Sequence, residues 1–218
     1  MRNVFFALMS RMQNIQRWSK SNPTRSENVA EHSLQVAMFA HCLGVIRNTQ
    51  FTDRPPVDEH KLTTLALFHD GPEVLTEDVN SLIKYSDARM LNLCREMEHI
   101  ACDMMLNTVP ESMVDTYRPL IQQHGQESEE ALFVKAADIL SAYAKALAEL
   151  RANNTEFRGT KEKLDKVIED FTVKLPEVGY FMEVFMPSFM LTIDDLVDAA
   201  FMPEPSAQEA MMQRRSVQ

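Results

Sequence analysis

The sequence predicts an all-α fold, a bundle of helices around an apolar core. Apolar residues recur at spacings of three and four along almost the whole chain, which is the period of a helix with one buried face. Sustained alternation of apolar and polar residues, the pattern of a half-buried strand, does not occur. Only 5 glycines occur in 218 residues, so folds with many tight turns are disfavoured. No strand is needed to explain the pattern.

Each expected helix carries an apolar stripe, and most begin at a residue suited to start a helix. Asn28 and Glu31 have the spacing of a capping box, while Asp58 and Ser128 can accept hydrogen bonds from the first turns that follow them. Pro110 can start another helix because its missing N–H is not needed there. The helices are expected at residues 5–18, 28–48, 58–70, 87–107, 110–120, 128–152 and 155–171. The helix at 87–107 is expected to bury a methionine-rich stripe of Met90, Cys94, Met97, Ala101 and Met104.

Length and composition predict one domain. A chain of 218 residues with 45% hydrophobic residues suits a single core, so residues 1–202 are expected to form one domain. Residues 73–85 should make a shorter connecting segment, and the aromatic segment at 180–189 should pack onto the bundle. Residues 203–218, with two prolines and several glutamines, are expected to form a disordered tail.

Charge and cysteine content disfavour several classes of function. The net charge of -10, from 22 Lys and Arg against 32 Asp and Glu, opposes binding to nucleic acid or to an anionic membrane surface. The cysteines Cys42, Cys94 and Cys102 are few and odd in number, which favours reduced thiols and a cytoplasmic protein. The apolar run near the N-terminus is too short for a signal peptide, and no apolar stretch approaches about 18 residues, so we expect no membrane partner.

Two histidines and two aspartates are the candidate chemical centre. His69 and Asp70 lie where a helix is expected to stop, so both side chains can turn toward one point. A His-Asp dipeptide alone is weak evidence, because it occurs often by chance. His32 strengthens it, since this imidazole lies on the inward face of its helix and needs a polar partner. Asp138 lies in mid-helix between apolar residues, where a carboxylate needs solvent, an ion pair or a cation.

Two imidazoles and two carboxylates from three helices form an N2O2 ligand set. Such a set suits Mn, Co, Fe or Zn and leaves positions open for water and substrate, which favours catalysis. A purely structural zinc site would more often be closed by thiolates, and the three cysteines lack the paired spacing of such sites.

Several candidate residues have a simpler structural interpretation. A single histidine on an apolar face is more often a core residue, so the argument depends on the whole ligand set. Glu73 and Asp78 could each be a carboxylate that stabilises the first turn of a helix. Arg17 could close the end of the first helix, and Trp18 could be an ordinary core aromatic.

The order His32, His69-Asp70 and Asp138 resembles the H…HD…D signature of the HD-domain metal-dependent phosphohydrolases. Longer stretches are similar to the bacterial 5′-deoxynucleotidases of the YfbR type. The similar stretches are Arg17-Trp18, residues 27–37 (ENVAEHSLQVA), Glu73–Thr76 with Asp78, Lys84-Tyr85, residues 135–138 (KAAD), residues 180–183 and residues 187–189. The resemblance covers about residues 4–200 and implies the HD-domain helical bundle.

The resemblance implies that His32, His69, Asp70 and Asp138 hold one divalent metal ion. Cobalt or manganese, or a similar transition metal, is the expected ion, and zinc also fits. His32, Asp70 and Asp138 would additionally lie against the bound substrate. In this role the ion polarises a phosphate and lowers the pKa of a bound water so that hydroxide can attack phosphorus.

The resemblance also implies roles outside the metal. Glu73 would be the general acid or base. Arg17 would orient the phosphate, because a guanidinium matches two phosphate oxygens. Trp18 would pack on the sugar and restrict space near its 2′ position, while Asp78 would accept a hydrogen bond from the 3′-hydroxyl. The implied activity is removal of the 5′-phosphate from deoxyribonucleoside monophosphates by a homodimer.

Two departures from the family pattern leave alternatives open. Pro72 constrains the backbone that presents Glu73, where the family commonly has small residues. Residues Asn80-Ser81-Leu82 replace a Pro-Thr-Pro turn near the sugar. The first alternative is therefore a phosphohydrolase that acts on ribonucleotides or nucleoside triphosphates. The second is a catalytically weakened nucleotide-binding module.

Overall fold

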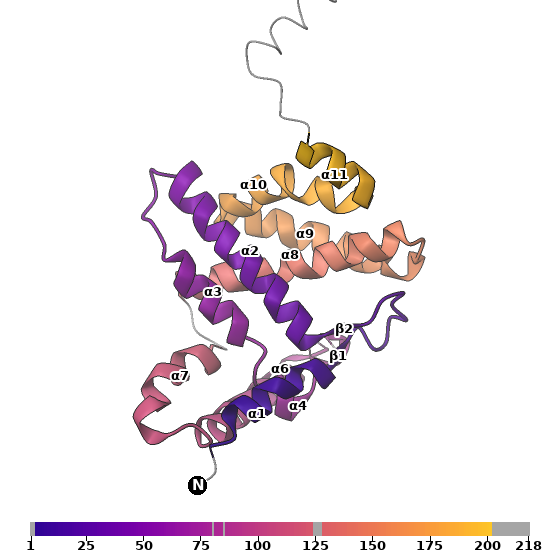
Figure 1. The fold of residues 1–218 in the computed structure, drawn as a ribbon. Coiled ribbons are helices and arrows are strands. Elements are labelled where there is room, and N and C mark those ends of the chain that lie inside the picture. The colour runs from indigo at the N-terminus through magenta and orange to yellow at the C-terminus, as the bar shows by residue number, and fades with distance from the viewer. Residues whose placement is uncertain (1–2, 80, 85, 124–127, 202–218) are drawn as a thin grey trace, which may run out of the picture.

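The all-α prediction is confirmed by a computed structural model that describes residues 3–79, 81–84, 86–123 and 128–201. The predicted tail at 203–218, Asn80 and Tyr85 lie outside the described residues. Figure 1 shows the arrangement of the helices. They are α1 (Phe5–Met9), α2 (Val29–Gln50), α3 (Glu59–Phe68), α4 (Glu73–Thr76), α5 (Ser81–Lys84), α6 (Ala88–Leu106), α7 (Val114–Ile121), α8 (Glu129–Arg151), α9 (Arg158–Lys174), α10 (Pro176–Val184) and α11 (Ile193–Phe201).

The helix starts that the sequence predicts are present. The Asn28 side chain accepts a hydrogen bond from the Glu31 N–H, and the Glu31 carboxylate accepts one from the Asn28 N–H, which completes the capping box of α2. Asp58 caps α3 by accepting from two backbone N–H groups, and Ser128 caps α8 in the same way with one. These caps satisfy donors that the first helical turn leaves without an intrahelical partner.

The main core lies where α2, α3 and α8 pack together, with α9 and α10 against α8 and α2. Aromatic side chains join α2 to the C-terminal segment, since the Phe39 ring lies 4.9 Å from that of Phe181 and 5.8 Å from that of Phe189. This contact is the packing expected for the aromatic segment. A second, smaller apolar cluster joins α1, α6 and α7 through Phe5, Cys102, Met105, Val109 and Ile121. The N-terminal end of α2 lies between the two groups of helices (Figure 1).

A short hairpin replaces the end of the expected first helix. α1 stops at Met9, a 3₁₀ turn follows over Ser10–Asn14, and the chain then becomes extended. β1 (Gln16–Arg17) pairs with β2 (Glu27–Asn28) in antiparallel register. The prediction that no strand is needed is wrong at this one place, because two-residue strands are too short to leave a period in the sequence.

One helix in the described part of the chain, α2, is long and apolar enough to cross a membrane by length and composition. The expectation that no stretch approaches that length is therefore wrong for α2. The helix serves as a core element, because 56% of its apolar window is buried inside the fold and it packs against both α3 and α8.

Candidate active site

His32 and Asp138 come together because α2 packs directly on α8. His32 lies in the first turns of α2 and is 1% exposed. Its Nε2 atom lies 3.1 Å from Oδ1 of Asp138, which comes from the middle of α8. The same Nε2 atom lies 3.6 Å from Oδ2 of Asp70. Residues that are 106 positions apart in the sequence therefore meet at one point.

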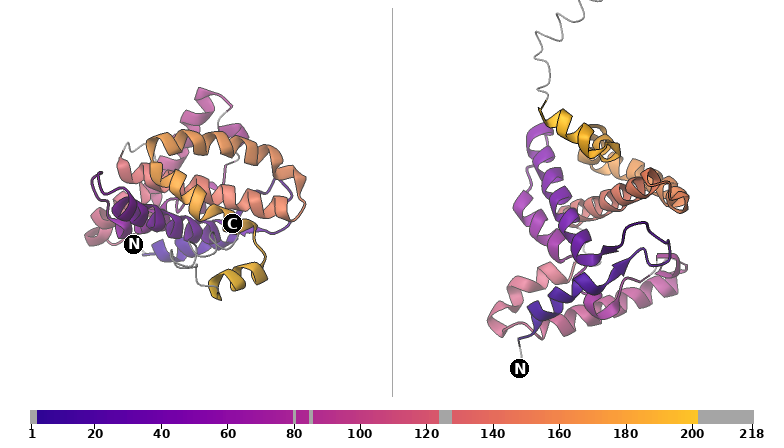
Figure 2. Two further views of the ribbon diagram at one scale, coloured as in Figure 1. Left: turned by 90° about the horizontal axis from the view of Figure 1, so that it is seen from above. Right: turned by 45° about the vertical axis from the view of Figure 1, so that its right-hand side comes forward.

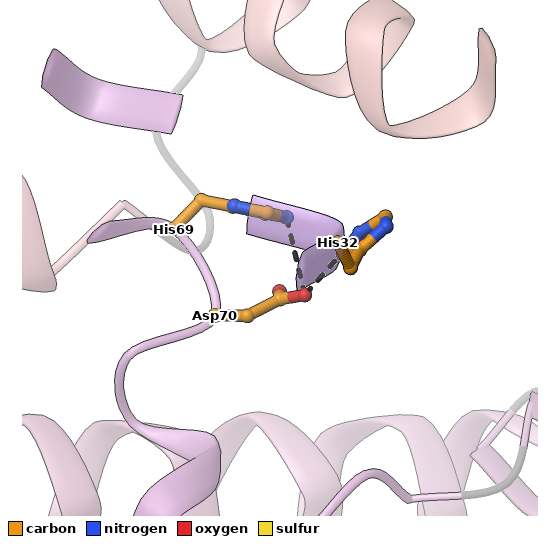
Figure 3. A group of neighbouring side chains, drawn as sticks. All are labelled: His32, His69 and Asp70. Atoms are coloured by element: carbon orange, nitrogen blue, oxygen red, sulfur yellow. Dashed lines mark ion pairs between the residues drawn. The ribbon is translucent and has the colours of Figure 1, made fainter. Parts of the chain in front are cut away.

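His69 and Asp70 reach this point because α3 ends at Phe68 and the chain turns there. Nε2 of His69 lies 3.1 Å from Oδ2 of Asp70, and the Asp70 carboxylate points between the two imidazole rings (Figure 3). His32, His69 and Asp70 each offer one ligand atom within 4.8 Å of the others, which is a spacing that could hold a metal ion.

The tautomer of His32 follows from its hydrogen bonds. The Ser141 hydroxyl donates to Oε1 of Gln35 at 2.7 Å, so the Ser141 oxygen is available to accept. It lies 3.1 Å from Nδ1 of His32, which therefore carries the proton and donates. Nε2 of His32 is then left with a lone pair that faces Asp70 and Asp138.

The tautomer of His69 follows in the same way. Its Nδ1 atom lies 2.7 Å from the carbonyl oxygen of Ala66, which can only accept, so Nδ1 is again the donor. Nε2 of His69 and Nε2 of His32 are both buried and make no hydrogen bond with the described residues. Two buried lone pairs beside two carboxylates repel one another unless a cation lies among them, so this donor set fits a divalent metal ion.

The charges at the cluster match a cation site. Burial would raise the pKa of Asp70, but His69, His32 and Arg17 outweigh burial and lower it below the usual range. Burial opposes ionisation of Asp138 as well, and Lys135 and His32 nevertheless hold its pKa well below the usual range. Both carboxylates are therefore ionised at neutral pH.

The surroundings shift the pKa values of the two imidazoles in opposite directions. Burial lowers the pKa of His32, and the nearby Arg17 guanidinium acts in the same direction, which favours the neutral ring that a metal ligand requires. Burial also acts to lower the pKa of His69, but Asp70 and Asp138 more than offset it and raise that pKa. A proton and a metal ion therefore compete for Nε2 of His69.

Glu73 begins α4 and lines a cavity that His69, Asp70 and Asp138 also line. Its Oε2 atom is buried and has no hydrogen-bond partner among the described residues. Burial raises its pKa to about 10, and the charges of Asp70 and Asp78 act in the same direction. Pro72 precedes it with φ -59° and ψ -20°, an ordinary proline geometry, and the Glu73 N–H donates to the Asp70 carbonyl at 3.0 Å. Pro72 therefore fits the turn that leads into Glu73 without strain.

Arg17 and Trp18 lie at the end of β1 and share one partner. Nε of Arg17 donates to Oε1 of Glu27 at 3.1 Å, and Nε1 of Trp18 donates to the same oxygen at 3.3 Å. Arg17 also donates through Nη1 to Oδ2 of Asp70 at 3.3 Å. The guanidinium is thereby placed at the edge of the His-Asp cluster.

The cavity beside the cluster has a volume of about 500 Å³. This size lies within the range of roughly 300–1,000 Å³ that is typical of small-molecule sites. Its lining includes the candidate residues Arg17, His69, Asp70, Glu73, Asp78 and Asp138. Asp78 has a raised pKa because of its burial, which Arg17 partly opposes. Trp18 is not among the lining residues, so the structure places it beside Arg17 without bringing it to the cavity wall.

Glu27, Ser141 and Gln35 support the site although no role was predicted for them from the sequence. Glu27 is a common partner of Arg17 and Trp18, and its Oε1 also lies 3.7 Å from Nδ1 of His32. Ser141 and Gln35 orient His32 from behind. A spacing of three residues on one helix could have indicated both, because Gln35 follows His32 and Ser141 follows Asp138 at that interval.

Comparison with solved structures defines the class of fold. An HD-domain phosphohydrolase from Listeria innocua superposes with a TM-score of 0.71 at 20% identity, over 87% of this chain and 89% of that one. A structure described as a metal-dependent phosphohydrolase from Magnetospirillum magnetotacticum MS-1 gives a TM-score of 0.61 at 21% identity, over 85% and 91% of the two chains. At these identities the likeness shows the fold alone, and the fold is the HD-domain helical bundle.

Sequence comparison defines the family. The model of the YfbR-like 5′-deoxynucleotidases matches residues 4–189. The 5′-deoxynucleotidase YfbR of Shigella flexneri serotype 5b (strain 8401) is 43% identical over 192 residues, which is 88% of this chain and 94% of the relative. The YfbR protein of Escherichia coli O1:K1 / APEC is 42% identical over the same shares. The chain belongs to the YfbR-like 5′-deoxynucleotidase family, which confirms the resemblance drawn from the motifs.

Proposed function

We propose that this protein is a metal-dependent phosphomonoesterase that hydrolyses deoxyribonucleoside 5′-monophosphates to deoxyribonucleosides and phosphate. Family membership supports the reaction, since relatives at 42–43% identity are 5′-deoxynucleotidases. The observation that carries the proposal is the pair of buried Nε2 atoms, on His32 and His69, which face two ionised carboxylates and lack hydrogen-bond partners in the described structure.

His32, His69, Asp70 and Asp138 are the proposed ligands of one divalent ion. Cobalt and manganese are the proposed ions, with zinc as the alternative, because imidazole and carboxylate ligands suit all three. When bound, such an ion supplies Lewis-acid polarisation of the phosphate and acidifies a water near neutral pH. Ser141 and the Ala66 carbonyl hold the two imidazoles in the tautomer that leaves Nε2 free to coordinate.

Arg17 is the proposed phosphate-binding residue. A guanidinium has five N–H donors, and the bonds to Glu27 and Asp70 use two of them. The remaining donors can bind phosphate oxygens as a fork while Glu27 keeps the plane of the group fixed. The positive charge also offsets the repulsion between a dianionic phosphate and a protein of net charge -10.

Glu73 is the proposed general acid. With its pKa raised to about 10, its carboxyl group is protonated at neutral pH and can give a proton to the O5′ atom of the leaving nucleoside. The carboxylate that remains can then accept a proton from water and return to its starting state. Burial beside Asp70 and Asp78 favours that return.

Asp78 is the proposed sugar contact, and Trp18 is the neighbouring residue proposed to influence the choice of sugar. Asp78 lines the cavity and can accept a hydrogen bond from a 3′-hydroxyl. Trp18 lies next to Arg17, with the Arg17 Cζ atom 6.0 Å from the centre of the Trp18 rings. Because the Trp18 ring does not line the cavity itself, its proposed effect on deoxyribose preference acts through the position of Arg17.

Phosphate release from matched substrates tests the proposal. The purified protein should release phosphate from dAMP and dTMP, lose that activity on chelation, and regain it when Co²⁺ or Mn²⁺ is added. AMP and dATP are the matched controls for sugar and phosphate number. Equal turnover of AMP or dATP would favour an HD phosphohydrolase of broader substrate range. Tight binding of dAMP without phosphate release, for every metal tried, would favour a nucleotide-binding module.

A cytoplasmic location and a homodimer are also proposed. The three cysteines Cys42, Cys94 and Cys102 are free, which suits a reducing compartment. Exposed Leu34, Met38 and Leu67 line a groove between α2 and α3 with a volume of about 300 Å³, which supports burial of this face in a dimer. Cell fractionation tests the location, and light scattering of the purified chain tests the dimer.

A further inference from the structure

The loop between β1 and β2, residues 18–26, is fastened to the far end of α8 by a buried carboxylate. Glu149 is 1% exposed. Its Oε2 atom accepts hydrogen bonds from the backbone N–H of Thr24 at 2.8 Å and from the Thr24 hydroxyl at 2.7 Å. The right-hand view of Figure 2 shows the loop reaching toward the C-terminal end of α8.

Two further side chains complete this attachment. Nζ of Lys145, one turn earlier on α8, lies 2.5 Å from Oε1 of Glu149 and donates to the Arg25 carbonyl at 2.6 Å. Nδ2 of Asn154 donates to Oε2 of Glu149 at 3.0 Å and to the Asn22 carbonyl at 3.1 Å. The loop backbone is thus held from both sides by groups that converge on a single carboxylate.

Glu149 is ionised at every working pH. Burial would raise its pKa, but the hydrogen bonds from Lys145, Thr24 and Asn154 outweigh burial and lower the pKa to about 2. A buried carboxylate that receives this many donors is a strong and specific anchor. Its donors come from the loop, from α8 and from the segment after α8, so all three lose a partner if the charge is removed.

The anchored loop begins at Trp18, directly after Arg17 of β1, and ends directly before Glu27 of β2. Trp18 has φ 59°, a left-handed conformation that a bulky residue adopts only when its surroundings enforce it. Its ring packs on Phe157, with ring centres 5.4 Å apart. Phe157 follows shortly after Asn154, so the attachment and the surface that supports Trp18 belong to one segment.

Glu149 lies too far along α8 to touch the reacting atoms. It is eleven residues beyond Asp138, which at 1.5 Å per residue is about 16 Å along the helix axis. An effect of Glu149 on the reaction must therefore pass through the loop.

We propose that Glu149 is a positioning residue that, with Lys145, holds the β1–β2 loop so that Arg17, with Trp18 beside it, stays in place to bind the substrate. The loop attachment is independent of the reaction, whereas the substrate part of the proposal rests on the proposed 5′-nucleotidase function. Without the anchor, Arg17 is not held in place before the phosphate binds. Part of the binding free energy is then used to order the loop, which weakens substrate binding but leaves the catalytic residues unchanged.

Tryptophan fluorescence measures the loop without any substrate, because Trp18 is the only tryptophan in the chain. In Glu149→Gln, the amide cannot accept the same set of donors, and its NH₂ group opposes one of them. We expect a red shift of Trp18 emission and a clear increase in acrylamide quenching. With dAMP as the substrate, we expect KM to rise by about tenfold or more and kcat to change much less.

The matched control is Glu177→Gln. Glu177 is a fully buried carboxylate at the start of α10, paired with Arg47, and it has no part in the loop. This variant should lose stability like Glu149→Gln but keep the emission, the quenching and the KM of the wild type. If Glu149→Gln does not fold, Thr24→Val replaces it, because it removes only one hydroxyl donor from an exposed position.

The readouts separate the two levels of the proposal. Wild-type emission and quenching in a folded loop variant would overturn the attachment, and an altered loop with unchanged KM would overturn the positioning role. A change of the same size in Glu177→Gln would overturn it as well, because the effect would then be one of general stability. A wild-type protein that releases no phosphate from dAMP would contradict the proposed function, and the fluorescence comparison would still decide the attachment.

Discussion

Replacing Glu73 by Gln separates the chemical role of this carboxyl group from its structural one. Its pKa is raised to about 10, so the native side chain is neutral at pH 7, and Gln matches the neutral form in shape. The general acid is lost, since an amide does not give up a proton at this pH. We therefore expect kcat for dAMP to fall by about 10² to 10⁴, which corresponds to roughly 2.7–5.4 kcal/mol of transition-state stabilisation.

The free energy of unfolding of the metal-free protein should contain a pH-dependent contribution from Glu73, and Glu73→Gln should remove that contribution. The folded-state pKa of Glu73 lies above its unfolded value of 4.5, so the folded protein holds a proton that the unfolded chain releases. The contribution of Glu73 to the free energy of unfolding is fully present below about pH 4.5 and is lost as pH rises toward 10. The free energy of unfolding changes by at most about 1.4 kcal/mol per pH unit over this range. Glu73→Gln should lack this component.

Urea unfolding of the chelated protein at pH 5.5, 7 and 8.5 measures the difference between wild type and variant. Relative to the wild type, Glu73→Gln should become more stable as pH rises. Substrate binding by the variant, measured with dAMP, should stay near that of the wild type. A parallel pH dependence in the two proteins would refute the raised pKa, and full activity of Glu73→Gln would remove this residue from the mechanism.

Three other substitutions test separate parts of the account. Arg17→Lys keeps the charge but loses the fork, so KM for dAMP should rise by about tenfold while metal content is unchanged; an unaltered KM would contradict phosphate binding by Arg17. Ser141→Ala removes the acceptor of the His32 Nδ1 proton, and metal affinity in a chelator competition should fall by about 10- to 100-fold. Asn28→Ala breaks the capping box with Glu31 and should lower the free energy of unfolding by about 1 kcal/mol in urea titrations; an unchanged value would contradict the cap.

The helices with clear caps could be predicted well, because the cap and the apolar stripe are both local in the sequence. Asn28, Asp58 and Ser128 mark the starts of α2, α3 and α8 within one residue. The sequence predicts a first helix that runs to Trp18, but α1 ends at Met9. The chain then forms a hairpin in which β2 begins ten residues after the end of β1. That pairing depends on a tertiary contact and leaves no local pattern.

The buried face of α6 shows why an apolar stripe can mislead. Met97 and Met104 were expected in the core but are 46% and 54% exposed. Cys94 and Ala101 are buried as predicted, and Met105 is fully buried in their company. Methionine is flexible and tolerates exposure, so its spacing constrains the orientation of a helix less than that of branched residues does.

The His-Asp cluster could be predicted because it consists of two residue types, histidine and aspartate, at recognisable positions in the sequence. The residues around it could not, since Glu27, Ser141 and Glu149 are common polar residues whose roles depend on which helix packs beside them. The link between Glu149 and the β1–β2 loop depends on a contact with Thr24, 125 positions away. Long-range contacts of this kind carry no spacing rule that a single sequence could reveal.

The central claim is that His32, His69, Asp70 and Asp138 meet around one divalent cation. Its most direct test is the metal content of the purified protein after dialysis against Co²⁺ or Mn²⁺, measured in parallel for the wild type and His69→Ala. We predict close to one ion per chain for the wild type and a large loss of bound ion in a His69→Ala protein that remains folded by circular dichroism. No bound metal in the wild type, or equal metal content in the two proteins, would contradict the claim.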